Sequence, residues 1–74
     1  MIENQDICEK IIRIMNECSA KLNETIILVQ DNCSDNEFIE YRKAAGFVMG
    51  YIYTDVLRPI YKQHPELEPP ELKR

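Results

Sequence analysis

The sequence contains one histidine, His64, as a candidate for acid–base chemistry. A catalytic histidine needs a carboxylate that orients it, and Glu66 or Glu68 could supply one. However, His64 precedes Pro65, and a residue before proline is biased toward extended backbone. A histidine that caps a helix or belongs to a polar tail is the more frequent situation in such a segment. We therefore predict no catalytic residue here.

The three cysteines, Cys8, Cys18 and Cys33, are the second group that could carry chemistry. An odd count leaves one of them unpaired in any disulfide scheme, and their spacing matches no zinc motif. We expect Cys18 to be buried in the middle of an apolar stripe, Cys8 to lie at the edge of that stripe, and Cys33 to be an exposed, ordinary thiol in a turn. No metal ligand and no cofactor are predicted.

A third group is typical of interaction surfaces. Arg42 lies within an apolar sector of the second predicted helix, where it either anchors an anionic partner group, extends past the hairpin end or pairs with a carboxylate. Phe47 and Tyr51 lie four residues apart outside the main apolar arc, and exposed aromatic side chains often mark interfaces, although the C-terminal tail could equally cover them. The candidate interaction residues are Arg42, Gly46, Phe47, Gly50, Tyr51, Tyr53 and Leu57.

Two long helices must position these residues. The first, over 5–31, contains neither Gly nor Pro and repeats apolar residues every three or four positions. Its predicted apolar stripe consists of Ile7, Ile11, Ile14, Met15, Cys18, Leu22, Ile26 and Val29. The second helix, over 35–61, has a main stripe of Phe38, Tyr41, Ala45, Val48, Met49, Ile52, Val56 and Ile60. The fold class is therefore all-α.

The connection at 32–34 is short, which makes the two helices antiparallel neighbours in a hairpin. Ser34 and Glu37 match a capping box that starts the second helix. Pro59 predicts a kink or a stop near the end of that helix. The residues 62–74 form a short proline-rich tail, in which Pro65 and Pro70 could each begin a short turn. Leu67 and Leu72 could dock this tail onto the hairpin.

The size of the chain predicts an oligomer. Its 74 residues form one domain, 1–74, and a chain this short buries only about 60% of its unfolded surface. Small scaffolds add disulfides, a metal or oligomerisation, and the cysteines support neither of the first two. The apolar arc of the second helix spans roughly 200°, more than one partner helix covers. We therefore predict a homodimeric four-helix bundle, with Gly46 or Gly50 at a close helix–helix crossing.

Charge and composition exclude several partners. The net charge of −4 argues against nucleic acid, which requires clustered basic residues. No apolar segment approaches the roughly 20 residues of a membrane span. The polar, acidic first residues do not look like a signal peptide, so a cytoplasmic location is expected.

The segments 46–52, 56–61 and 64–67 (GFVMGYI, VLRPIY and HPEL) resemble a pattern in small uncharacterised bacterial helical-hairpin proteins. The resemblance covers roughly the C-terminal half of the chain. It implies an all-helical fold and a bacterial, cytoplasmic origin, and it implies no activity and no functional residues.

The sequence favours a non-enzymatic function: a protein–protein interaction module, such as an adaptor, regulator or accessory subunit, that acts as a homodimer on an unidentified protein partner. One alternative is a small ligand-binding or enzymatic bundle that uses His64, Arg42 and the tyrosines around a pocket. Another, resting on net charge alone, is an acidic neutralising partner of a toxin or basic protein.

Overall fold

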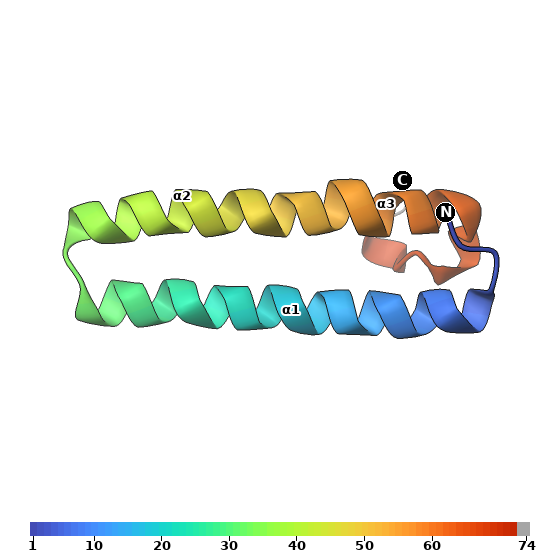
Figure 1. Cartoon of the computed structure of the whole chain (residues 1–74), viewed down its shortest axis with the longest axis horizontal. Coiled ribbons are helices and arrows are strands. Elements are labelled where there is room, and N and C mark those ends of the chain that lie inside the picture. The colour runs from blue at the N-terminus through green and yellow to red at the C-terminus, as the bar shows by residue number, and fades with distance from the viewer. Residues whose placement is uncertain (73–74) are drawn as a thin grey trace.

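In the computed structural model, which describes residues 1–72, the chain folds into two long antiparallel helical arms (Figure 1). Helix α1 spans Gln5–Asn32 and α2 spans Asp35–Tyr51. The second arm continues through a π-helical segment, η1, at Ile52–Leu57 and helix α3 at Arg58–Gln63. Two short 3₁₀ turns, η2 at Pro65–Leu67 and η3 at Pro70–Leu72, complete the described chain. The predicted all-α hairpin is confirmed.

Both arms begin at side chains that cap them. Asn4 Oδ1 accepts a hydrogen bond from the Ile7 N–H at 3.2 Å at the start of α1. At the start of α2, the Glu37 N–H donates to Ser34 Oγ at 3.2 Å and the Ser34 N–H donates to Glu37 Oε1 at 3.0 Å. The predicted capping box is therefore present. The Ser34 N–H and, after it, the Ser34 hydroxyl, which donates to Glu37 Oε1 at 3.0 Å, hold the pKa of Glu37 below its ordinary value.

Pro59 neither stops the second arm nor ends its hydrogen bonding. The ring of a helical proline crowds the carbonyl four residues earlier, and proline has no N–H to satisfy that carbonyl. The turn before Pro59 widens into the π-helical η1, in which the Arg58 N–H donates to the carbonyl of Tyr53, five residues back. This widening carries the arm on to Gln63, two residues beyond the predicted end.

The packed core is small and lies mainly at the open end of the hairpin. The five buried apolar residues among those described are Cys8, Ala45, Leu57, Ile60 and Tyr61. Six of the eight partly buried positions on α1 follow Cys8 with alternating spacings of four and three: Ile12, Met15, Ser19, Leu22, Ile26 and Val29. This seam corrects the prediction for the cysteines, because Cys8 is fully buried whereas Cys18 is exposed.

Hydrogen bonds between the N-terminal segment and the end of α3 stabilise the open end of the hairpin. Gln63 Oε1 accepts a hydrogen bond from the Ile2 N–H at 3.0 Å, and His64 Nε2 donates to the Ile2 carbonyl at 2.8 Å. Because a carbonyl only accepts, Nε2 of His64 carries the proton. The His64 N–H also closes α3 on the carbonyl of Ile60.

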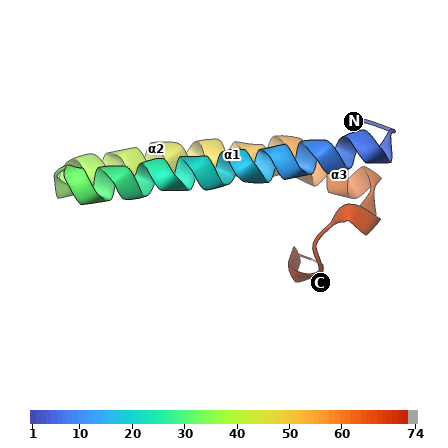
Figure 2. The same cartoon turned by 90° about the horizontal axis from the view of Figure 1, so that it is seen from below.

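The tail leaves one side of the hairpin, as Figure 2 shows. Each of its turns begins with a proline, as predicted. Leu67 is half-buried, whereas Leu72 remains exposed, so only the first of the two predicted docking leucines packs on the protein. The pKa of Tyr61 is raised first by burial and then by the nearby Tyr53 and Glu68. Because Glu68 belongs to the tail, this effect agrees with the tail lying against the buried end.

The hairpin is long and thin. It measures 45 × 23 × 20 Å, and its radius of gyration is 14.8 Å. A compact chain of this length has a radius of gyration of about 11 Å. Among the described residues, no helical segment combines the length and the apolar character needed to cross a membrane.

Candidate interaction surfaces

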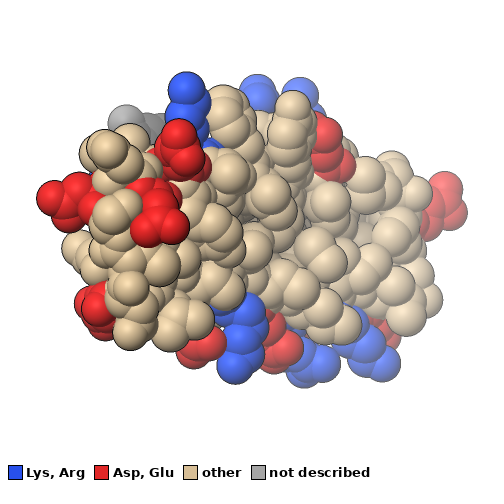
Figure 3. Space-filling view, turned by 60° about the vertical axis from the view of Figure 1, so that its left-hand side comes forward, with Lys and Arg blue, Asp and Glu red and all other residues tan. Residues whose placement is uncertain are grey.

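A groove between the two arms is the first candidate surface. It has a volume of about 570 Å³ and runs along the middle of the hairpin. Its lining residues, which define the α1–α2 groove, are Ile14, Glu17, Cys18, Lys21, Leu22, Thr25, Val48 and Ile52. Figure 3 shows one face of the hairpin as a broad uncharged band, bordered by charged side chains along both long edges.

Large apolar side chains of the groove are open to solvent. Ile14 is 47% exposed and Val48 is exposed to a similar degree. Ile7, seven residues before Ile14 and therefore on the same side of α1, is also exposed. None of the described tail residues lines the groove. Residues 1–72 of a single chain therefore leave this apolar surface uncovered.

One hydrogen-bond chain ties the arms together beside the groove. The Tyr41 hydroxyl on α2 donates to Thr25 Oγ1 on α1 at 2.7 Å. The Thr25 hydroxyl in turn donates to the Leu22 carbonyl at 2.6 Å. Leu22 and Thr25 belong to the α1 wall of the groove. These two hydrogen bonds therefore help to hold the α1 wall in position relative to α2.

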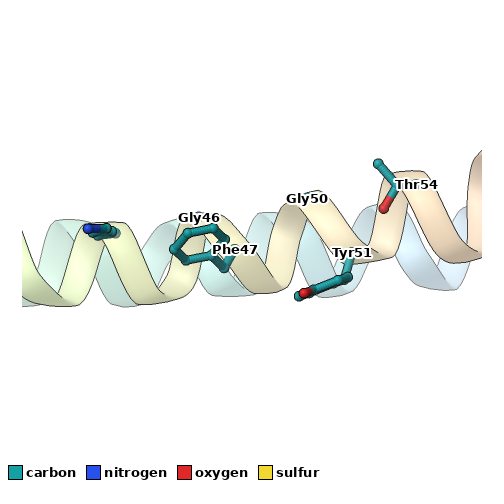
Figure 4. A pocket seen from close by; sticks show the side chains of 6 residues that line it. Gly46, Phe47, Gly50, Tyr51 and Thr54 are labelled. Carbon is teal, nitrogen blue, oxygen red and sulfur yellow. The ribbon is translucent and has the colours of Figure 1, made fainter.

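The second candidate surface lies on α2 and is viewed in Figure 4 with α1 behind it. Its shallow hollow, the α2 outer surface, is lined by Lys43, Gly46, Phe47, Gly50, Tyr51 and Thr54. Phe47 is 61% exposed and Tyr51 is 63% exposed. The sequence leaves open whether Phe47 and Tyr51 are exposed or covered by the C-terminal tail. In the structure both side chains are exposed to solvent.

Neither glycine of this surface is required by the fold of the single chain. A Cβ added at Gly46 or Gly50 would meet no atom within 4 Å, and neither residue has a positive φ. A glycine inside a helix costs about 0.5–1 kcal/mol of stability relative to alanine. No contact within the described chain offsets that cost.

The other predicted interaction residues are dispersed. Arg42 lies over the ring of Phe38, with Cζ 5.3 Å from the ring centroid, so a cation–π contact occupies its guanidinium. Tyr53 is exposed but lines neither candidate surface. Leu57 is only 6% exposed and belongs to the core of the hairpin, so it contributes to neither candidate surface. Leu57 lies in the π-helical η1, whose wider turn departs from the angular spacing of a regular helical wheel.

The residues proposed for a ligand pocket do not converge. Arg42 and His64 lie on the same arm, 22 residues apart, which corresponds to roughly 33 Å along a helix. His64 Nδ1 lies 3.6 Å from Glu66 Oε1, while Nε2 is engaged with Ile2. Within residues 1–72, no three His, Cys, Asp or Glu side chains lie close enough together to hold a metal ion.

The α1–α2 groove was not anticipated from the sequence. The sequence predicts Ile14 and Cys18 in the apolar stripe of the first helix, whereas in the structure they are exposed and lie outside the seam that starts at Cys8. Ile7, Ile11, Ile14 and Cys18 follow the same alternating four-and-three spacing as the seam, so no spacing signal in the sequence separates the two stripes. No family model, no curated protein and no solved structure matches this chain.

Proposed function

We propose that the protein is a small protein–protein interaction module that acts as a homodimer. Two hairpins pair through their α1–α2 grooves and form a four-helix bundle. The observation that carries this proposal is the uncovered apolar groove, with its exposed Ile14 and Val48. In four-helix bundles such stripes face each other and form the core.

The exposed area supports the pairing. The accessible surface of the chain is 5628 Å². A folded monomer of 8.7 kDa has about 4,700 Å², so each chain exposes about 900 Å² in excess. A stable interface of standard size buries about 800 Å² per partner. The excess is therefore enough for one such interface.

The groove is also suited to pairing with itself. A two-fold interface presents the same surface from both copies, so it must be self-complementary. The charged residues that line the groove are Glu17 and Lys21, one of each sign. Each copy can therefore offer an acid and a base at the rim of an apolar centre.

This pairing revises the expectation for the glycines. Gly46 and Gly50 do not line the α1–α2 groove. In a bundle built on the groove, they lie outside the homodimer interface. A close helix–helix crossing at these glycines therefore requires a partner other than the second copy of the homodimer.

Two matched isoleucine variants test the proposal. Ile14 lines the groove and is 47% exposed, whereas Ile27 lies outside it on the same helix and is 48% exposed. Ile14→Lys should shift the mass measured by light scattering from dimer toward monomer, because it brings a charge into an apolar interface. Ile27→Lys should leave the mass unchanged. Equal behaviour of the two variants would contradict a dimer built on the groove.

A further inference from the structure

The α2 outer surface continues along the second arm to α3. The whole strip, formed by the lining residues of two adjoining hollows, is called the track. A second hollow, lined by Thr54, Arg58, Pro59 and Lys62, shares Thr54 with the first. The two hollows therefore adjoin each other. From residue 43 to residue 62 they span roughly 30 Å along the arm, the length of a 20-residue helix.

The charges along this track are of one sign. Lys43 lies toward one end, and Arg58 and Lys62 lie toward the other. No acidic residue lines either hollow, although the chain as a whole carries a net charge of −4. Among residues 1–72, the one ion pair that involves a lysine or arginine is Lys21–Glu24, so the three bases of the track have no acidic partner in the described chain.

The middle of the track is shaped for close approach of another backbone. Gly46 and Gly50 lie four residues apart on one side of α2, with open space above both. Such a pair lets a second helix approach more closely than side chains normally permit. Phe47 and Tyr51 stand beside the glycines and offer exposed aromatic contacts (Figure 4).

We propose that this track binds an amphipathic α-helix of a different protein, with small residues at its centre and acidic side chains toward both ends. The opposite sign of charge on the partner matches the unpaired bases of the track. A second copy is a poor occupant, because two-fold pairing of this track would set a basic surface against itself. The glycines of the track, unnecessary in the single chain, are explained by the approach of that partner helix.

The probe for this interaction is a fluorescein-labelled helical peptide of about 20 residues, with alanines at the crossing and glutamates at both ends. A charge-reversed peptide with lysines in place of the glutamates is its control. Fluorescence anisotropy should show binding of the acidic peptide, weakened by added salt. Absence of binding, or equal binding of the two peptides, would overturn the proposal.

Protein variants make the test specific to the track. Gly50→Leu should weaken binding of the acidic peptide by roughly tenfold or more, and so should the paired change Lys43→Glu and Lys62→Glu. Leucine is a good helix former and Gly50 has open space above it, so the variant should fold, which circular dichroism checks. Ala20→Leu, at an exposed position of α1, should bind the peptide like the wild type. Undiminished binding by Gly50→Leu would contradict the proposal.

Sedimentation of the same variants separates this proposal from the homodimer. Gly50→Leu should retain the mass of the wild type, because the track lies outside the α1–α2 groove. A shift of Gly50→Leu from dimer to monomer would show that a second copy occupies the track and would overturn the proposal. A monomeric wild type that still binds the acidic peptide through Gly50 would support the track and contradict only the homodimer.

Discussion

The Tyr41 hydroxyl donates a 2.7 Å hydrogen bond to Thr25 Oγ1, which joins α2 to α1. It is the only side chain–side chain hydrogen bond between the two arms among residues 1–72. The remaining contact between α1 and α2 is largely apolar packing along the seam. This bond therefore contributes to the relative position of the two walls of the groove.

Removing that hydroxyl should have a measurable cost. Tyr41→Phe should lower the free energy of unfolding by about 1 kcal/mol, the usual net value of one hydrogen bond. Urea denaturation followed by circular dichroism measures the change. Tyr51→Phe is the matched control, because Tyr51 is exposed and makes no hydrogen bond within the described chain. An equal effect of both substitutions would show that the Tyr41–Thr25 bond contributes nothing of its own.

The capping box at the start of α2 should behave as one unit. Ser34→Ala should lower the free energy of unfolding by about 1 kcal/mol, because it leaves the Glu37 N–H without its partner. The effects of Ser34→Ala and Glu37→Ala should not add, since each residue serves the other. Full additivity in a double-mutant cycle would contradict the reciprocal geometry.

The same box should make stability depend on pH. The pKa of Glu37 is lower in the folded than in the unfolded chain, so its contribution is present above the ordinary glutamate pKa. This contribution should be lost as the pH falls through the lowered value. Denaturation curves of the wild type and of Glu37→Gln, compared between neutral and acidic pH, test this. The difference between them should shrink at acidic pH, and a constant difference would contradict the prediction.

The glycines should show that stability and binding are separate requirements. Gly46→Ala and Gly50→Ala should each raise the free energy of unfolding by about 0.5–1 kcal/mol, because alanine favours the helix and has room at both positions. Thermal or urea denaturation measures the gain. A loss of stability on either substitution would mean that the glycine serves a contact within the chain or the homodimer.

Cys18 offers an internal reporter of the homodimer. It lines the α1–α2 groove close to the midpoint of α1, and a face-to-face pairing brings the midpoints of the two grooves together. A short bismaleimide should therefore link two chains through Cys18. The linkage should be lost in Cys18→Ser and retained in Cys33→Ser, whose thiol lies at the turn. Linkage that depends on Cys33 instead would contradict the pairing.

Local sequence signals predicted most of the fold. The antiparallel hairpin, the Ser34–Glu37 box and the proline that opens each turn of the tail depend on neighbouring residues, which the sequence displays directly. The conformation near the end of the second arm could not be predicted from local signals alone. Proline predicts a disturbed turn, but the choice between a stop, a kink and the π-helical η1 depends on the packing around it.

The buried seam could not be fixed by periodicity alone. Apolar residues cover two adjacent stripes of α1, and a helical wheel does not say which stripe faces the partner arm. The wheel therefore placed Cys18 in the core and Cys8 at its edge, the reverse of what is found. The Gly46–Tyr51 region can be identified as a candidate surface because glycines inside a helix and aromatics outside the main apolar arc are recognised by type and spacing. That the tail leaves Phe47 and Tyr51 exposed depends on packing and is seen only in the structure.

The mass of the wild-type protein in solution tests the central claim most directly. Sedimentation equilibrium at micromolar concentration should give twice the chain mass of 8.7 kDa, because each chain exposes the area of one standard interface. Ile27→Lys should give the same mass. A wild-type protein that remains a stable monomer of 8.7 kDa across the concentration range would contradict the homodimer.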